Sequence, residues 1–212
     1  MEATATKKIL STPTTNKGFT LIEVLIVIGL IALLFASVSL PTKKNYNRKI
    51  KTELRKMAVM SRYIHELAKL HHLTYRLVID LRTGKDSTEP HQYWVEKTSK
   101  TVFFKKASNE KKKKKSSRDP DGFEKDPHVM KHPRELPSGL YFESVELASS
   151  EKPIKEGIAY IYYLPEGLAQ EAVVHIKHKK YDELNWSLAV LPLTGKGKLI
   201  PKNISLKELQ EQ

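Results

Sequence analysis

Two patterns of apolar residues divide the first third of the chain. Between Phe19 and Leu40, 22 residues include one ionisable side chain, Glu23. A helix of that length covers roughly 33 Å, enough to cross the hydrocarbon core of a membrane. A cleaved secretory signal peptide is the alternative, although its apolar region is usually about 7–15 residues long. The pattern therefore favours a transmembrane helix over residues 19–41, with Pro41 at the point where the helix stops or kinks.

The second pattern is a stripe with helical spacing. Beyond Pro41, apolar or small residues recur every three or four positions while Lys and Arg occupy much of the remaining surface. This spacing predicts an amphipathic helix over residues 42–73 that continues the first helix and packs on the following domain. The stripe consists of Ile50, Leu54, Met57, Ser61, Ile64 and Ala68.

From residue 74 onward the apolar residues alternate with a period of two, which is typical of β-strands. Gly, Pro, Asn or Asp bound most of these short runs. Residues 74–212 are therefore expected to form an antiparallel sheet or small sandwich, and the fold class is α+β with a long N-terminal helix packed on this β-rich head. The candidate strands are YRLVIDL, QYWVEK, TVFF, LYFESVEL, IAYIYYL, AVVHIKH and NWSLAVLPL.

Residues 105–137 interrupt this pattern, because they are poor in aliphatic residues and rich in charge, Pro and Ser. Such a segment buries too little apolar area to offset its chain entropy, so a basic flexible loop is expected. Within it Lys111, Lys112, Lys113, Lys114 and Lys115 form a run that either contacts an anionic surface or belongs to a solvated insertion. No aromatic residue interrupts the run, which makes stacking on single-stranded nucleic acid unfavourable.

The composition excludes several kinds of chemistry. The chain has no cysteine, so disulfides, thiolate catalysis and zinc–thiolate sites are excluded. The eight histidines do not have the spacing of a metal site, and we expect them to lie on the surface without a specific function. No nucleophile or phosphate-binding motif is present. We therefore expect no enzymatic activity, no cofactor and no metal.

Glu23 needs a separate explanation, because a carboxylate inside a membrane costs about 2.5–3.5 kcal/mol on insertion scales. It lies in the first turn of the predicted span, where a helix N-terminus favours negative charge. If the chain were cut before Phe19, the new α-ammonium would lie on the same turn. That amine could neutralise Glu23 of the same chain, or that of a neighbouring helix in staggered register.

The segment Lys17-Gly18-Phe19-Thr20-Leu21-Ile22-Glu23 resembles the processing motif of type IV prepilins and of the pseudopilins of type II secretion. The resemblance implies that residues 1–18 are a leader, which prepilin peptidase removes between Gly18 and Phe19. It further implies N-methylation of Phe19, a role for Glu23 in entry into a filament, and Lys17 as part of the recognised context.

A second resemblance lies near the C-terminus, where YYLPEGLAQEAVVHIKHK and NWSLAVLPLTGKGKL are similar to the pattern of H-type minor pseudopilins. It implies a pilin-like fold in a minor pseudopilin of a type II secretion system. Such a subunit is anchored in the bacterial inner membrane by one span, has its head in the periplasm, and assembles with other pseudopilins on an inner-membrane platform. The matching residues, which also have ordinary duties in turns and core, are Tyr163, Pro165, Glu166, Gly167, Trp186, Thr194 and Gly195.

Two alternatives stay open. One is a minor pilin of a type IV pilus or competence system, which could bind DNA. The lack of cysteine and the non-basic C-terminal sequence ISLKELQEQ favour secretion, and nucleic acid is an unlikely partner. The other is a single-span membrane enzyme or adaptor that keeps its leader. The charges oppose the motif, because five cations between Lys43 and Lys51 follow the span and the positive-inside rule would place the head in the cytoplasm.

Overall fold

The computed structural model describes residues 18–38, 43–100, 102 and 122–211 of the 212-residue chain. The chain divides into two compact units, Met1–Pro41 and Thr42–Gln212. In the first unit, helix α1 covers Leu21–Val38. Its aliphatic composition and the near absence of charge match the apolar run of the sequence.

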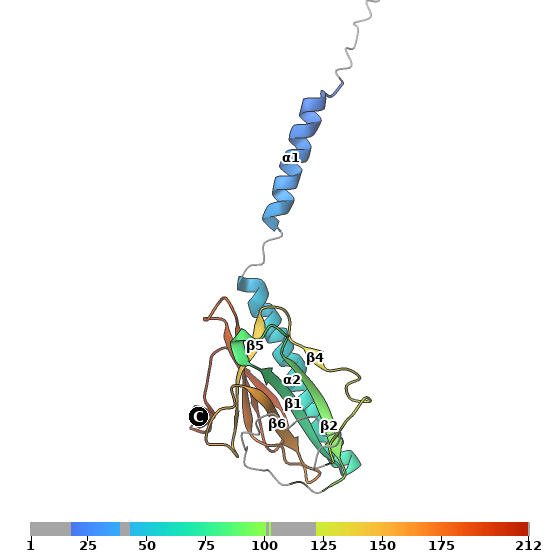
Figure 1. Ribbon diagram of the computed structural model, residues 1–212, viewed down its shortest axis with the longest axis vertical. Helices are drawn as coiled ribbons and strands as arrows, with labels where there is room; N and C mark the ends of the chain where they lie inside the picture. Colours follow the sequence, from blue (N-terminus) through green and yellow to red (C-terminus); the bar gives the residue numbers. More distant parts are fainter. Residues whose placement is uncertain (1–17, 39–42, 101, 103–121, 212) are drawn as a thin grey trace, which may run out of the picture. The chain divides into compact units, whose positions relative to one another are not determined.

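Helix α2, Lys43–His71, opens the second unit and runs lengthwise alongside the strands in Figure 1. All six residues of the expected stripe are buried, as are Glu53 and His65. The stripe packs against both sheets described below, because its residues share one core cluster with residues of those sheets. The expected continuity between α1 and α2 stays a prediction, since residues 39–42 lie outside the described residues.

The first sheet has five strands in the described part of the chain, in the order β3-β2-β1-β6, with β4 also pairing with β2. Strands β1 (Thr74–Arg82) and β2 (Gln92–Thr98) form the expected antiparallel hairpin, and β6 (Gly157–Tyr163) pairs with the other edge of β1. Strands β3 (Glu124–Lys125) and β4 (Arg134–Glu135) each add two residues to β2.

The second sheet has four antiparallel strands in the order β5-β7-β8-β9. These are β5 (Leu140–Leu147), β7 (Ala172–His178), β8 (Asn185–Val190) and β9 (Gly197–Ile200). One face of this sheet joins the main core. The C-terminal segment covers the other face, where Ile204 and two residues of the short helix α3 (Leu206–Gln210), Leu206 and Leu209, pack on Val173 and Ala189.

The main core lies entirely within the second unit. Its buried members run from Ile50 to Val190, and the partly buried residues around it end at Leu199. The described members of this cluster and of the two smaller ones belong to the second unit. The second unit therefore holds the apolar interior that a domain of its size needs to fold without the first.

The flexible loop predicted over residues 105–137 is wrong for residues 122–137. This part carries β3 and β4, and it buries Phe123, Asp126 and Leu136. The Asp126 carboxylate lies 3.1 Å from Lys97 Nζ, and the Leu136 amide donates to the His91 carbonyl. These contacts on the edge of β2 order a segment whose composition alone predicts a mobile loop. The fold is α+β, as the sequence predicts.

Candidate functional site

The candidate site is the segment from Gly18 to Glu23, at the start of α1. Thr20 precedes the first residue of α1 and caps it, since its side-chain oxygen accepts a hydrogen bond from the Glu23 amide at 3.3 Å. The Thr20 carbonyl also accepts from the Glu23 amide, at 3.1 Å. The cap holds Glu23 in the first turn, where the unpaired amides of a helix N-terminus favour a carboxylate.

The bond between Gly18 and Phe19 lies before this helix, in exposed chain without helical or strand structure. The Phe19 side chain is 82 % exposed. A Cβ added at Gly18 would meet nothing within 4 Å. The bond is therefore open to a peptidase, and the local structure places no steric demand for glycine at position 18.

The surface of α1 is apolar on every side. Each large apolar side chain from Phe19 to Phe35 is between 46 % and 82 % exposed within its unit. A soluble helix usually buries its apolar stripe. A helix that exposes apolar side chains all round, as α1 does, needs lipid or other helices to cover them. Measured by length and hydropathy over the described residues, no helix qualifies as a membrane span. The transmembrane helix expected over residues 19–41 stays a prediction.

Several predicted site residues cannot be placed. Lys17 and the run Lys111 to Lys115 lie outside the described residues, as does most of the expected strand TVFF, of which Val102 is buried and not in a strand. The proposed contact of the lysine run with an anionic surface therefore stays a prediction.

The C-terminal residues that carry the second resemblance have structural duties. Gly167 and Gly195 adopt positive φ angles of 84° and 60°, as turns require. Both turns touch α2, because the Gly167 carbonyl lies 3.0 Å from His65 Nε2 and the Gly195 carbonyl accepts from Ser61 Oγ at 2.7 Å. Trp186, expected in the core, is half-buried at its rim and donates to Asn47 Oδ1 at 2.6 Å.

The expectation of surface histidines is wrong for His65, His91, His175 and His178, each of which is buried. All four rings have a polar partner that compensates for burial. His65 contacts the Gly167 carbonyl, and His175 Nδ1 lies 3.0 Å from Ser187 Oγ. His91 Nδ1 accepts from the Phe142 amide, and His178 Nδ1 accepts from the Lys180 amide at 3.0 Å. Burial lowers the pKa of His91, His175 and His178. No group of three potential metal ligands occurs among the described residues.

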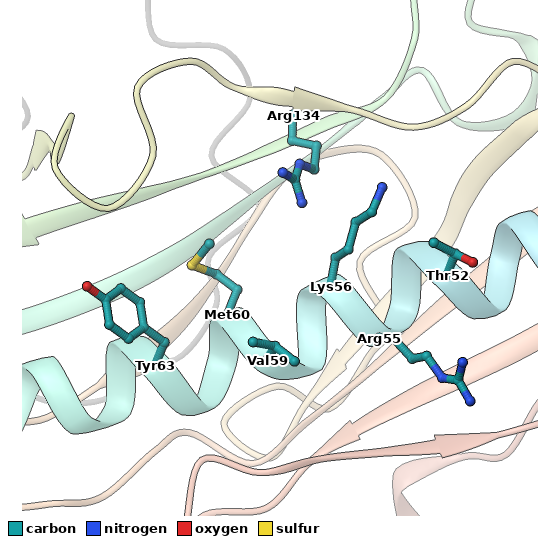
Figure 2. A pocket seen from close by; sticks show the side chains of 7 residues that line it. All are labelled: Thr52, Arg55, Lys56, Val59, Met60, Tyr63 and Arg134. Atoms are coloured by element: carbon teal, nitrogen blue, oxygen red, sulfur yellow. The ribbon is translucent and has the colours of Figure 1, made fainter.

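A groove of about 430 Å³ lies on the outer face of α2. Figure 2 shows Arg134, from β4, pointing toward Lys56 and Met60 of α2. The remaining lining comes from α2 and includes no carboxylate or histidine, so the groove provides positive charge and apolar surface but no acid–base pair. The lining residues are Thr52, Arg55, Lys56, Val59, Met60, Tyr63 and Arg134.

Comparisons with known proteins bear on the N-terminal segment. No curated protein matches the chain. A solved structure with similarity is the minor pseudopilin EpsH from the Type 2 Secretion System of Vibrio cholerae, with 14 % identity and a TM-score of 0.42 over 71 % of this chain and 95 % of that one. Residues 14–39 match the family described as the prokaryotic N-terminal methylation motif. The chain thus carries a prepilin-type N-terminal methylation motif, within which Gly18, Phe19 and Glu23 lie.

Proposed function

We propose that the protein is a minor pseudopilin, a structural subunit of the periplasmic pseudopilus of a type II secretion system. The observation that carries the proposal is the methylation motif over residues 14–39, in which the Gly18–Phe19 bond is exposed just before a capped apolar helix whose one ionisable side chain is Glu23. In this function residues 1–18 are the leader, α1 anchors the subunit in the inner membrane, and residues 74–212 form most of the periplasmic head.

The first step is hydrolysis of the Gly18–Phe19 bond by prepilin peptidase, which leaves Gly18 with a carboxylate and Phe19 with a free amine. The same enzyme then methylates that amine. Glu23 is four positions after Phe19, which corresponds to about 6 Å along a helix. The new ammonium can therefore approach the Glu23 carboxylate of its own helix or of a helix alongside.

The second step is assembly with other pseudopilins on the inner-membrane platform. An isolated charge in hydrocarbon is costly, so pairing of the Phe19 ammonium with a Glu23 carboxylate stabilises one register between two neighbouring helices and disfavours the others. The exposed aliphatic surface of α1 supplies the remaining contact, because packing against like helices replaces contact with lipid. The protein needs no catalytic group for this task, and we expect no enzymatic activity.

The packed C-terminus supports secretion over DNA uptake as the setting. Ile204 is buried, and the Leu206 amide donates to Glu146 Oε2 at 2.8 Å. Gln210 Nε2 donates to Glu171 Oε2 at 2.8 Å. Residues 204–210, which are held on the second sheet in this way, are therefore not a free basic tail of the kind that we expect of a DNA-binding pilin. Neighbouring genes for a secretin and a secretion ATPase, as opposed to genes for pilus retraction and competence, would separate the two systems.

Mass spectrometry of the protein extracted from membranes tests the proposal. We expect an N-terminus at N-methylated Phe19. An intact leader beginning at Met1 or Glu2 would contradict the proposal and favour a membrane protein that keeps its leader. A Gly18→Ala variant is the matched control, because a Cβ at this position meets no atom within 4 Å. If this variant folds normally but is not cleaved, the glycine is required by the peptidase and not by the fold.

A further inference from the structure

Aromatic and basic side chains gather where the second unit begins. The Tyr46 ring of α2 lies 4.0 Å from the His178 ring and 5.9 Å from the Tyr181 ring, measured between centroids. Trp186 of β8 donates to Asn47 Oδ1 at 2.6 Å. The first turns of α2 are thus held against the turn between β7 and β8. We call the three rings and the five cations of the first turns of α2 the juxtamembrane cluster: Tyr46, Tyr181 and Trp186 with Lys43, Lys44, Arg48, Lys49 and Lys51.

Three lysines of this cluster lie over its rings. Lys43 Nζ is 5.3 Å from the Tyr181 centroid, and Lys49 Nζ is 5.3 Å from the Tyr46 centroid. Lys51 Nζ lies 5.9 Å from the Trp186 centroid. Tyr46, Tyr181 and Trp186 are all half-buried. The rings therefore combine a protected apolar body with a polar or charged edge, as do the aromatic residues that proteins place at membrane–water interfaces.

The first turns of α2 carry an excess of positive charge, and the carboxylates near them, Asp182 and Glu183, come from the turn between β7 and β8. The first nine residues of α2, KKNYNRKIK, hold five cations and no carboxylate. Lys43 forms an ion pair with Glu183. Within the described part of the chain, the other four cations (Lys44, Arg48, Lys49 and Lys51) form no ion pair with a carboxylate. They are exposed and able to bind an anionic surface.

The length of the chain limits how far this surface can lie from the end of α1. Five steps along the chain separate Val38 from Lys43, and an extended segment of that length reaches at most about 18 Å. The headgroup layer on each side of a membrane is itself several ångströms thick. If α1 spans the membrane, the first turn of α2 lies within reach of the headgroups.

From these observations we infer that the juxtamembrane cluster is a docking surface for the headgroups of anionic phospholipids in the membrane that holds α1. The inference rests on the proposed function, because α1 must first anchor the subunit. Nucleic acid is disfavoured as the occupant, since lysine ammonium groups and neighbouring rings already cover faces of Tyr46 and Tyr181 on which bases would stack. The inference also gives a role to the five cations that oppose the positive-inside rule, because they bind lipid on the periplasmic side.

The two tryptophans of the chain allow a direct test in the full-length protein. Trp94 on β2 is a matched control for Trp186. It is also half-buried, donates from Nε1 to a side chain at 2.6 Å and has a lysine ammonium 5.2 Å from its centroid. The variants Trp94→Phe and Trp186→Phe each leave one reporter. We would reconstitute both in vesicles of phosphatidylglycerol and brominated phosphatidylcholine and compare fluorescence quenching.

We expect Trp186 to be quenched strongly and Trp94 weakly. Equal quenching of the two reporters in protein that floats with the vesicles would overturn the docking inference and leave the membrane anchor intact. Failure of the protein to float with vesicles would contradict the anchor itself, and with it both proposals.

A second experiment tests the charges on residues 42–212, which contain their own core. The variant Lys44→Gln, Arg48→Gln, Lys49→Gln is compared with Lys152→Gln, Lys155→Gln, Lys202→Gln, which removes equal charge from exposed positions elsewhere. Both are made with Lys111 to Lys115 replaced by glutamine, so that the lysine run does not mask the effect.

We expect the first variant to bind phosphatidylglycerol vesicles roughly tenfold or more weakly than its parent, and the second to change little. Equal losses in the two variants would overturn the inference, because general charge would then explain binding. It would also be overturned if a single-stranded oligonucleotide bound the parent more tightly than the vesicles and displaced them.

Discussion

The Tyr163 hydroxyl donates a hydrogen bond of 2.8 Å to Ser61 Oγ, and Ser61 Oγ donates in turn to the Gly195 carbonyl at 2.7 Å. This relay joins β6, α2 and the turn between β8 and β9 in the interior, where Tyr163 and Ser61 have no exposed surface. Burial raises the pKa of Tyr163, so its hydroxyl stays a donor at all ordinary pH values.

Ser61→Ala should destabilise the head by about 2–3 kcal/mol, because it leaves the Tyr163 hydroxyl and the Gly195 carbonyl without their partner. Tyr163→Phe should cost about 1 kcal/mol. The double variant should cost less than the sum of the two, which urea unfolding of residues 42–212 would measure. Strict additivity would show that the two side chains do not act as a pair.

The turn that opens β9 approaches α2 so closely that a methyl group does not fit. A Cβ at Gly197 would lie 2.6 Å from the Ala58 Cβ and 2.8 Å from its Cα. We expect Gly197→Ala to cost about 3 kcal/mol, because backbone would have to move. Gly157→Ala is the control, since Gly157 has a φ of 82° but open space around it, and backbone strain alone should cost about 1 kcal/mol.

Replacing Ala58 by glycine checks the cause of that loss. The change should restore part of the stability of the Gly197→Ala variant while destabilising the parent, where glycine within a helix costs about 1 kcal/mol. Equal effects in both backgrounds would rule out the steric explanation.

The stability of the head should decrease below about pH 6.5. Burial lowers the pKa of His91 and of His175 from the ordinary value of 6.5, and Glu146 offsets part of the shift at His175. As the pH falls, the unfolded chain binds protons that the folded rings do not accept, so the free energy of unfolding decreases. The slope has an upper limit of about 1.4 kcal/mol per pH unit for each ring.

Urea unfolding of residues 42–212 between pH 7.5 and 5 measures this slope. The His91→Gln variant should show a smaller slope than the parent, whatever its stability at neutral pH. A stability that stays constant or rises on acidification would contradict the assignment of both rings as neutral.

Glu23 is expected to act in assembly and not in folding, because it lies in the exposed first turn of α1, outside every core cluster. Glu23→Gln should leave the melting temperature of the head unchanged. It should lower the incorporation of the protein into filaments by about tenfold or more, because the charge pair that Glu23 forms in the membrane is lost. Glu156→Gln removes one exposed carboxylate from the head and serves as the control. Quantitative blotting of sheared filaments gives the ratio, and equal incorporation of the two variants would disprove charge pairing.

The elements that the sequence predicts well are those with a long local period. The stripe on α2 and the hairpin of β1 and β2 follow from their patterns, because each buries one regular set of apolar residues. The motif from Gly18 to Glu23 is also local, so its residues can be found without knowledge of the fold. Strands β3 and β4 have two residues each, too few for any period to appear.

What the sequence does not predict depends on contacts between distant residues. His175 is buried because the C-terminal segment covers the outer face of β7, so polarity is a poor guide to burial in that strand. The hydrogen bond from Trp186 to Asn47 joins residues 139 positions apart. The sequence alone therefore does not predict the juxtamembrane cluster. In the sequence its cations appear only as an excess of positive charge after the apolar run.

The described core clusters consist of residues from the range 42–212, and this composition has a consequence for the order of events in the cell. The head can complete its folding after it has crossed the membrane, while α1 is still in the bilayer, whether or not the leader has been removed. Folded subunits can then accumulate in the membrane before filament assembly requires them. On the proposed function, folding of the head then sets no limit on when α1 can leave the lipid for the filament.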